Sequence, residues 1–162
     1  MIKQTMNKTF SKTPARQTSY KSGVLKFLPL GGCGEVTRSC YVYEYEDDII
    51  IIDMGLQFPE DDMPGIDYII PNVEYLKPKK RNIRGLVITH GHYDHIGAIP
   101  HLLEPLGNPP LYTTALTRGI ILKRQEEFTH SPKPKIYTIN SESKVKLGKF
   151  EVEFFHVNHN IP

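Results

Sequence analysis

Residues 90–95 of the 162-residue chain read HGHYDH, and this stretch carries four side chains that can bind a metal ion. It follows an apolar run at 86–88, typical of a buried strand, and precedes residues 96–106, which have the spacing of a helix. The stretch therefore predicts a metal-binding loop at the junction between a strand and a helix.

The four ligands fall into two pairs by their spacing. Alternate side chains of an extended segment share a face, so His90 and His92 can bind one ion together. Asp94 and His95 follow where the chain turns, and they can face a second ion beside the first. Imidazole and carboxylate ligands favour zinc, then manganese or iron, over metals that prefer thiolates.

The charge of the chain is distributed unevenly. The net charge is +2, but residues 1–22 carry five Lys and Arg and no acid, which leaves residues 23–162 with 15 bases against 18 acids. The body is therefore not a basic nucleic-acid-binding domain on charge alone. With 39% apolar residues, the chain can bury the core of one domain.

Residues 1–22 are rich in Thr, Ser, Lys and Gln and lack a sustained apolar period, which predicts a disordered basic tail. A transit peptide, an arm that attracts polyanions and an extension without a role all fit this composition. No stretch of about 18 apolar residues occurs, so we expect neither membrane insertion nor secretion. Cys33 and Cys40 are too few for a disulfide framework, and free thiols favour a cytoplasmic location.

Short apolar runs predict a mixed α/β sandwich. Strands are expected at 24–28, 41–45, 49–52, 86–89, 136–139 and 150–157, and helices at 96–106 and 114–128. The first three strands are closely spaced, as in an antiparallel meander, with a turn at Asp47 and Asp48. Strands in the first part, with helices entering later, place the chain in the α/β class.

Two loops are unusual in composition. Residues 58–67 read FPEDDMPGID, a long acidic loop whose three consecutive acids suit either a calcium ion or plain solvation. Residues 31–36 read GGCGEV, which is neither a phosphate loop nor a dinucleotide fingerprint. These glycines are expected to permit a tight turn or a close backbone approach beside the site.

Residues 89–98, THGHYDHIGA, resemble the signature of the metallo-β-lactamase fold, an αββα sandwich. Asp53, after the run at 49–52, matches the Asp that this superfamily carries behind the metal loop, where a carboxylate can orient a metal-bound imidazole. Together with residues 31–36, 58–67 and 158–162 (NHNIP), the motif is similar to the bacterial ribonuclease J family, which belongs to the β-CASP group.

This resemblance implies a two-metal site with Zn²⁺ or Mn²⁺. His90, His92 and His159 would hold the first ion, and Asp94 and His95 would hold part of the second. A hydroxide between the two metals would attack the phosphate of RNA, from the 5′ end or internally. The implied activity is that of a metal-dependent ribonuclease in RNA maturation and decay, including rRNA processing.

The resemblance also implies a calcium ion against the backbone of Gly65 and the carboxylate of Asp67. Homo-oligomers are common among the family's complete enzymes. Three further histidines receive no role: His101, His130 and His156, the last expected to be a strand residue that faces solvent.

Family enzymes continue past the NHNIP motif with a bridging Asp, an inserted domain and a late His. We therefore expect residues 23–162 to be a truncated N-terminal portion of the domain, inactive alone. Two alternatives stay open: a catalytically silent fragment that binds one metal, and a small-molecule hydrolase of the same fold. Residues 58–67 and 158–162 argue against the second alternative.

Overall fold

The computed structural model describes residues 23–161, so the predicted basic tail at 1–22 lies outside the described residues. Its centre is a six-stranded sheet with the strand order β1-β2-β3-β4-β5-β6. The strands are β1 (Leu25–Gly31), β2 (Cys40–Tyr45), β3 (Asp48–Ile52), β4 (Ile83–Val87), β5 (Leu111–Thr113) and β6 (Ile136–Thr138). A separate hairpin consists of β7 (Lys144–Leu147) and β8 (Phe150–Glu153).

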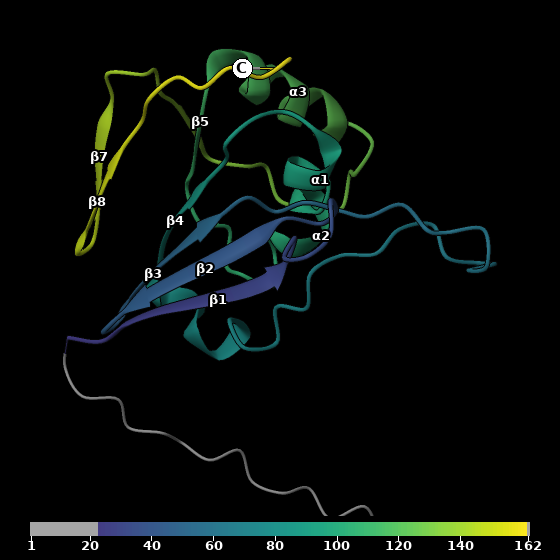
Figure 1. Ribbon diagram of the computed structural model, residues 1–162, viewed down its shortest axis with the longest axis horizontal. Helices are drawn as coiled ribbons and strands as arrows, with labels where there is room; N and C mark the ends of the chain where they lie inside the picture. The colour runs from purple at the N-terminus through teal and green to yellow at the C-terminus, as the bar shows by residue number, and fades with distance from the viewer. Residues whose placement is uncertain (1–22, 162) are drawn as a thin grey trace, which may run out of the picture.

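The sheet is antiparallel at one end and parallel at the other. β1, β2 and β3 form the predicted antiparallel meander, whereas β4, β5 and β6 each pair in parallel with the preceding strand. The helical segments that connect the strands are η1 (Lys77–Asn82), α1 (Tyr93–Ile96), α2 (Ile99–Leu102) and α3 (Ala115–Gln125). The parallel strands therefore direct their carboxyl ends, and the loops that follow them, to one edge of the sheet (Figure 1).

The side chains of alternate residues of β3 lie on opposite faces of the sheet. Ile49 and Ile51 pack in the main core with side chains of α1, α2 and α3, whereas Ile50 packs with Leu147 of the hairpin. Helices thus cover one face and the hairpin covers part of the other (Figure 1). Because β3 is buried on both faces, it reads as a continuous apolar run and not as an alternating one.

The predicted helix at 96–106 is shorter and divided in the structure. α1 ends at the C-cap Gly97, and α2 begins separately at Ile99. Pro100 is the second residue of α2 and has no N–H to donate to the preceding turn, so continuous helical hydrogen bonding is interrupted there. The predicted helix at 114–128 is α3, with Thr114 as its N-cap.

Several strand boundaries also differ from the predictions. β8 ends at Glu153, which pairs with Lys144, the first residue of β7, so no partner strand remains beyond it. His156 is exposed as predicted, but it lies after the strand. Asp48 belongs to β3 and is buried, so the turn precedes it. β5 and β7 were not predicted, because three or four residues are too few to establish a period.

None of the helices within residues 23–161 is long and apolar enough to cross a membrane. Both cysteines are free thiols, with Cys33 exposed and Cys40 buried. Burial, together with the negative charge of Asp53, raises the pKa of Cys40 to about 12, so this thiol stays protonated in the core.

A buried carboxylate joins β1, β2 and the segment around η1. Glu44 of β2 accepts hydrogen bonds from Lys26 at 2.6 Å and from Tyr75 and Lys79 at 2.7 Å. Burial alone would raise the pKa of Glu44, but these three donors outweigh it and lower the pKa below the ordinary 4.5. The ionised form of Glu44 therefore stabilises the fold.

We predict that Glu44→Gln lowers the free energy of unfolding at pH 7 by about 1–3 kcal/mol, the usual effect of removing a charged hydrogen-bond partner. A lowered folded-state pKa means that the contribution is present above the unfolded pKa of Glu44 and is lost as the pH falls through the folded value. The free energies of unfolding of the unaltered chain and of Glu44→Gln, measured by urea denaturation, should therefore differ less below about pH 4.5.

Glu74→Gln is the matched control, because Glu74 is 70% exposed and pairs only with Lys77 across one turn. It should change stability by less than about 0.5 kcal/mol. Equal effects of the two substitutions at pH 7 would contradict the assignment of Glu44 as a stabilising buried charge.

Candidate metal centre

The HGHYDH motif spans the end of the loop after β4 and the start of α1, at the strand-to-helix junction that its flanking sequences predicted. β4 ends at Val87 and α1 begins at Tyr93 with His92 as its N-cap, so residues 88–92 form the crossing. In α/β sheets, ligands bind in the crevice outside the carboxyl ends of parallel strands. The loop occupies that edge (Figure 1).

Backbone hydrogen bonds fasten the motif to the segments after β1 and β3. Three N–H groups of these segments donate to carbonyls of the motif: Ser39 to Asp94 at 2.7 Å, Met54 to His95 at 2.8 Å and Leu56 to Tyr93 at 3.0 Å. Residues 93–95 are therefore fixed by main-chain contacts, independently of their side chains.

This close approach of backbones requires a glycine. A Cβ added at Gly55 would lie 1.6 Å from the carbonyl oxygen of Asp94, a distance that no side chain can adopt. The close approach at Gly55 was not predicted. In the loop at 31–36, Gly31 permits a close backbone approach, since a Cβ added there would lie 2.4 Å from the carbonyl oxygen of Arg38. Gly32 and Gly34 serve a turn, since both have positive φ angles of 83° and 80°.

Asp53 is the buried anchor behind the motif. It directly follows β3, is 2% exposed and has a φ of 61°, a left-handed conformation that Asp tolerates better than most residues. Its carboxylate accepts hydrogen bonds from the Thr89 N–H at 2.8 Å and the Thr89 hydroxyl at 2.9 Å. His95 Nδ1 lies 2.7 Å from Asp53 Oδ2.

These contacts define which nitrogen of each imidazole carries the proton. His95 Nδ1 donates to Asp53, which leaves the lone pair on Nε2, 3.3 Å from Asp94 Oδ2. Thr89 donates its hydroxyl proton to Asp53 and so accepts from His90 Nδ1 at 3.0 Å, which leaves the lone pair on His90 Nε2. Asp53 thus orients His95 directly and His90 through Thr89.

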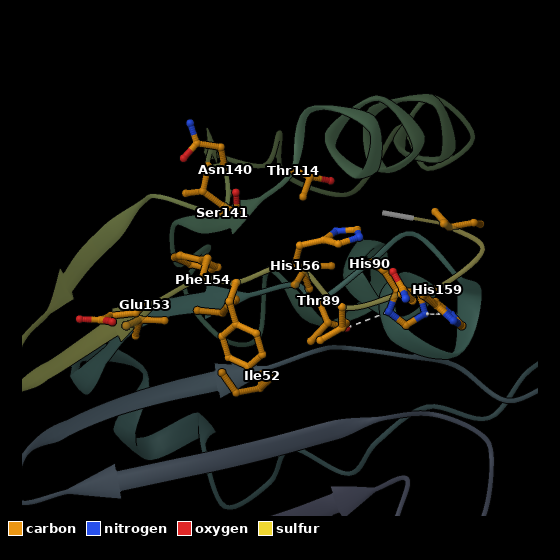
Figure 2. Close-up of a pocket in the computed structure, with 18 residues that line it drawn as sticks. Ile52, Thr89, His90, Thr114, Asn140, Ser141, Glu153, Phe154, His156 and His159 are labelled. Carbon is orange, nitrogen blue, oxygen red and sulfur yellow. Dashed lines mark hydrogen bonds between the residues drawn. The ribbon is translucent and has the colours of Figure 1, made fainter.

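Three imidazole nitrogens converge on one point. His90 Nε2 and His92 Nδ1 are 3.0 Å apart, and His159 Nε2 lies 3.1 Å from each of them. His159 arrives from the segment after β8, which returns to the edge of the sheet beside His90 (Figure 2). Among residues 23–161, this is the one group of three or more His, Cys, Asp or Glu side chains whose ligand atoms lie close enough to hold an ion.

The arrangement fits a shared cation better than a hydrogen-bond network. Three nitrogens in mutual contact cannot all be satisfied, because each neutral imidazole nitrogen is either a donor of one proton or an acceptor. A tetrahedral zinc with Zn–N distances of about 2.0–2.1 Å separates its ligand nitrogens by roughly 3.3 Å. The observed separations of 3.0–3.1 Å are close to that value.

The electrostatics favour the neutral form of His90. Burial, with the neighbouring charge of His95, lowers the pKa of His90 to about 4, so His90 is neutral at physiological pH and its lone pair is available. Burial would also lower the pKa of His95, but the hydrogen bond to Asp53 outweighs burial and raises it.

A groove of about 740 Å³ opens beside the triad. His90 and His159 close one end, and Phe154 lies toward the other, while Thr114, Asn140 and Ser141 form a polar rim (Figure 2). The groove is open to solvent along the edge of the sheet, so an extended ligand can reach the imidazole nitrogens without entering the core.

Two contributors were absent from the sequence-based set of site residues. Thr89 couples His90 to Asp53, and Gly55 admits the backbone of Asp94. The position of Thr89 immediately before the first His was the only available signal for it. Gly55 gave no signal of its own, since its role depends on a contact across 39 residues.

The predicted calcium ligands lie apart from the triad. The loop that carries Gly65 and Asp67 is closed at its base by paired hydrogen bonds between Gln57 and Ile69, and it projects from the body of the molecule (Figure 1). Gly65 has a φ of 82° and Asp67 is exposed. The calcium site remains a prediction, as do the metal-binding roles of the histidines and Asp94.

The family comparison agrees with the fold and the site. The model of the metallo-beta-lactamase superfamily matches residues 33–159, which include all the predicted ligands. The chain therefore belongs to the metallo-beta-lactamase superfamily. A crystal structure of a protein of unknown function from Enterococcus faecalis V583 shares the fold, with a TM-score of 0.58, 17% identity and coverage of 80% of this chain and 36% of that chain.

Within the superfamily, the predicted resemblance to ribonuclease J is confirmed. The chain is 40% identical to Ribonuclease J 1 of Streptococcus pyogenes serotype M3, over 89% of this chain and 26% of the relative. It is 36% identical to Ribonuclease J 2 of Staphylococcus saprophyticus, over 88% of this chain and 25% of the relative. The chain thus spans about a quarter of the length of these curated relatives.

We predict that the purified chain retains about one zinc or manganese ion per molecule, because three imidazoles nearly complete a tetrahedral set, whereas Asp94 and His95 alone form a weak site. Metal analysis after dialysis should show loss of the ion in His92→Ala. Two tightly held ions in the unaltered chain would contradict this prediction.

We predict further that Asp53→Asn weakens zinc binding by about 10- to 100-fold, the usual effect of removing a group that orients metal-bound imidazoles. Competition with a chelating dye measures the affinity. Asp47→Asn is the control, because Asp47 is exposed and near the opposite end of β3. Equal zinc affinities of the two variants would show that Asp53 does not orient the ligands.

Proposed function

We propose that the chain forms the metal-binding part of a hydrolytic nuclease that acts on RNA. The observation that carries the proposal is the convergence of the His90, His92 and His159 nitrogens at 3.0–3.1 Å on the edge of an open groove. Its similarity to two ribonucleases J supplies the substrate class.

In this proposal His90, His92 and His159 hold one divalent ion, and Asp94 with His95 contributes ligands to a second. Bound divalent ions would supply an activated water at neutral pH and Lewis-acid stabilisation of the charge that develops on a phosphate. The residues of the chain set the geometry for this chemistry. Asp53 accepts a hydrogen bond from His95, and the Thr89 hydroxyl accepts one from His90, so these two imidazoles are held in one tautomer before an ion binds.

The groove supports a polymeric substrate. It adjoins the triad at one end and opens to solvent, with Asn140 and Ser141 on its rim and mostly apolar side chains along its walls. A single strand of RNA can lie in such a groove and present one phosphate to the His90–His159 end. Orientation of a reacting group next to its catalyst can supply about 7–11 kcal/mol of barrier reduction.

Further features of the proposal are the predictions from the sequence and from its resemblance to the ribonuclease J family. They comprise action in RNA maturation and decay by exonucleolytic or endonucleolytic cleavage, a calcium ion at Gly65 and Asp67, a cytoplasmic location and assembly into homo-oligomers. The two competing functions are a catalytically silent metal-binding protein and a small-molecule hydrolase that cleaves thioesters or lactams.

A chimera tests the proposal. In it, this chain replaces the aligned quarter of Ribonuclease J 1 from Streptococcus pyogenes serotype M3. We expect the chimera, loaded with Mn²⁺ or Zn²⁺, to cleave 5′-monophosphorylated RNA, and we expect Asp94→Ala and His90→Ala to reduce the rate by at least about 1,000-fold, since metal-assisted charge stabilisation supplies several kcal/mol. The 162-residue chain alone should cleave RNA no faster than its own His90→Ala variant.

The controls separate the competing functions. A chimera that is folded by circular dichroism and loaded with metal, but cleaves a thioester or lactam and leaves RNA intact, would favour the small-molecule hydrolase. A folded, metal-loaded chimera that hydrolyses none of these substrates would favour the silent metal-binding protein. RNA cleavage by the short chain that depends on His90 would refute the expected need for further catalytic groups.

A further inference from the structure

We propose that Tyr93, backed by Arg124 and flanked by Phe58, is a stacking platform that positions a nucleobase of the RNA beside the metal centre. The inference rests on the proposed function, because it assigns a substrate-positioning role to residues around the same site. The proposed platform lies at a groove separate from the one that is lined by His90 and His159. This second groove, of about 330 Å³, lies between α1 and α3.

Tyr93 is placed between the two sets of predicted metal ligands. It follows His92 and precedes Asp94, and its backbone is fixed by the hydrogen bond from Leu56 N–H to its carbonyl at 3.0 Å. Its side chain nevertheless points out of the core and is 40% exposed. An aromatic ring on a rigid backbone next to a reaction centre loses little entropy when a flat ligand stacks on it.

One face of the Tyr93 ring is already occupied. The guanidinium carbon of Arg124 lies 4.6 Å from the ring centroid, and Phe58 lies to the side, with centroids 6.3 Å apart and planes tilted by 44°. Phe58 is itself 62% exposed. The platform therefore presents two exposed rings at an angle, with a cation behind one of them.

Arg124 is held in place as a support for the ring. It lies in the last turn of α3, its side chain is only 12% exposed, and its guanidinium also lies 5.1 Å from the Phe128 ring. Its Nε is buried and has no hydrogen-bond partner among the described residues. The guanidinium is thus positioned by two aromatic rings and by Glu127, and its contact with the Tyr93 ring stabilises the position of that ring.

The groove shares a wall with the metal loop. Ile120, which lines the groove, would come within 2.6 Å of a Cβ added at Gly91, the residue between His90 and His92. Gly119 forms an open part of the groove, because a Cβ added there would meet nothing within 4 Å. One apolar side chain therefore separates the groove from the backbone of the predicted ligands.

The charges around the groove permit a polyanion to approach. Lys123 and Arg124 line it, and each faces an acid three residues further along the chain, at the end of α3, Glu126 at 2.6 Å and Glu127 at 3.7 Å. The pair of Lys123 and Glu126 is exposed on both sides, at 80% and 65%, so it is weak and a phosphate can compete for Lys123. The acidic loop that begins at Phe58 projects away from the body (Figure 1).

A nucleobase fits these features better than a protein side chain. Single-stranded nucleic acids are bound by aromatic rings that stack on bases, with cations that track the backbone. Two tilted, exposed rings with neighbouring Lys and Arg match that combination. A base stacked on Tyr93 would lie on the same segment as His90 and His92, with Ile120 between the groove and their backbone.

The chain contains no tryptophan, so Tyr93→Trp introduces a single fluorophore into the platform. The probe is an unstructured RNA of roughly twelve nucleotides, within the usual range of single-strand binding sites. We expect this RNA to quench the fluorescence, and an abasic oligonucleotide of the same length and charge to leave it unchanged. Tyr137→Trp is the matched control, because Tyr137 is also exposed and stacked on a tyrosine, but lines neither groove.

Affinity provides the second measurement. Fluorescence anisotropy with labelled RNA should show binding weakened by roughly five- to 100-fold in Tyr93→Ala, the effect of losing one stacked base, and little change in Tyr93→Phe. Zinc content should be the same in both variants. The platform alone would be overturned if RNA bound to Tyr93→Trp without quenching its fluorescence and bound to Tyr93→Ala as tightly as to the unaltered chain. Equal quenching in the Tyr137→Trp control would also overturn it. Absence of RNA binding by the unaltered chain would also overturn the platform, whereas the proposed function is tested separately by RNA cleavage by the chimera.

Discussion

The buried carboxylate of Asp53 is the contact on which the rest of the site depends. It lies at the end of β3, the strand most deeply buried in the sheet, and it bonds to Thr89 and His95 on the loop after β4. A carboxylate removed from water in this way must have its hydrogen bonds satisfied, and the metal loop supplies them. The need to satisfy one buried group thus determines the positions of His90 and His95.

Backbone contacts make this arrangement rigid. The hydrogen bonds from Ser39, Met54 and Leu56 to carbonyls of residues 93–95 hold the loop even where its side chains are exposed. Gly55 permits them, since any larger residue would collide with Asp94. A loop fixed by its main chain can expose reactive side chains without losing their geometry, which is the condition for a preorganised metal site.

The same loop presents different groups to its two sides. His90 faces the groove that it shares with His159, whereas Tyr93 faces the groove along α3. In this arrangement the ligands of a metal and the proposed support for a base are three residues apart on one rigid segment. A substrate held at both places would have little freedom at its reactive phosphate.

The HGHYDH motif and Asp53 could be predicted from the sequence because their roles depend on local spacing and on the superfamily resemblance. His159 required that resemblance, since a residue 67 positions from His92 has no local relation to it. The extents of the helix at 96–106 and of the strand at 150–157 were predicted incorrectly. Pro100 interrupts the hydrogen bonding of the helix, and the partner strand β7 is too short to pair with the whole of 150–157.

By itself, the sequence determined the α/β class through its side-chain pattern and the superfamily through the resemblance of its motifs, and it predicted a metal site from the type and spacing of its histidines. Only the tertiary structure decided which nitrogen of each imidazole is free, since that depends on the hydrogen bonds of Asp53 and Thr89. It also decided that Tyr93 lies on Arg124. Such contacts join residues far apart in the sequence, and no local pattern encodes the distance between them.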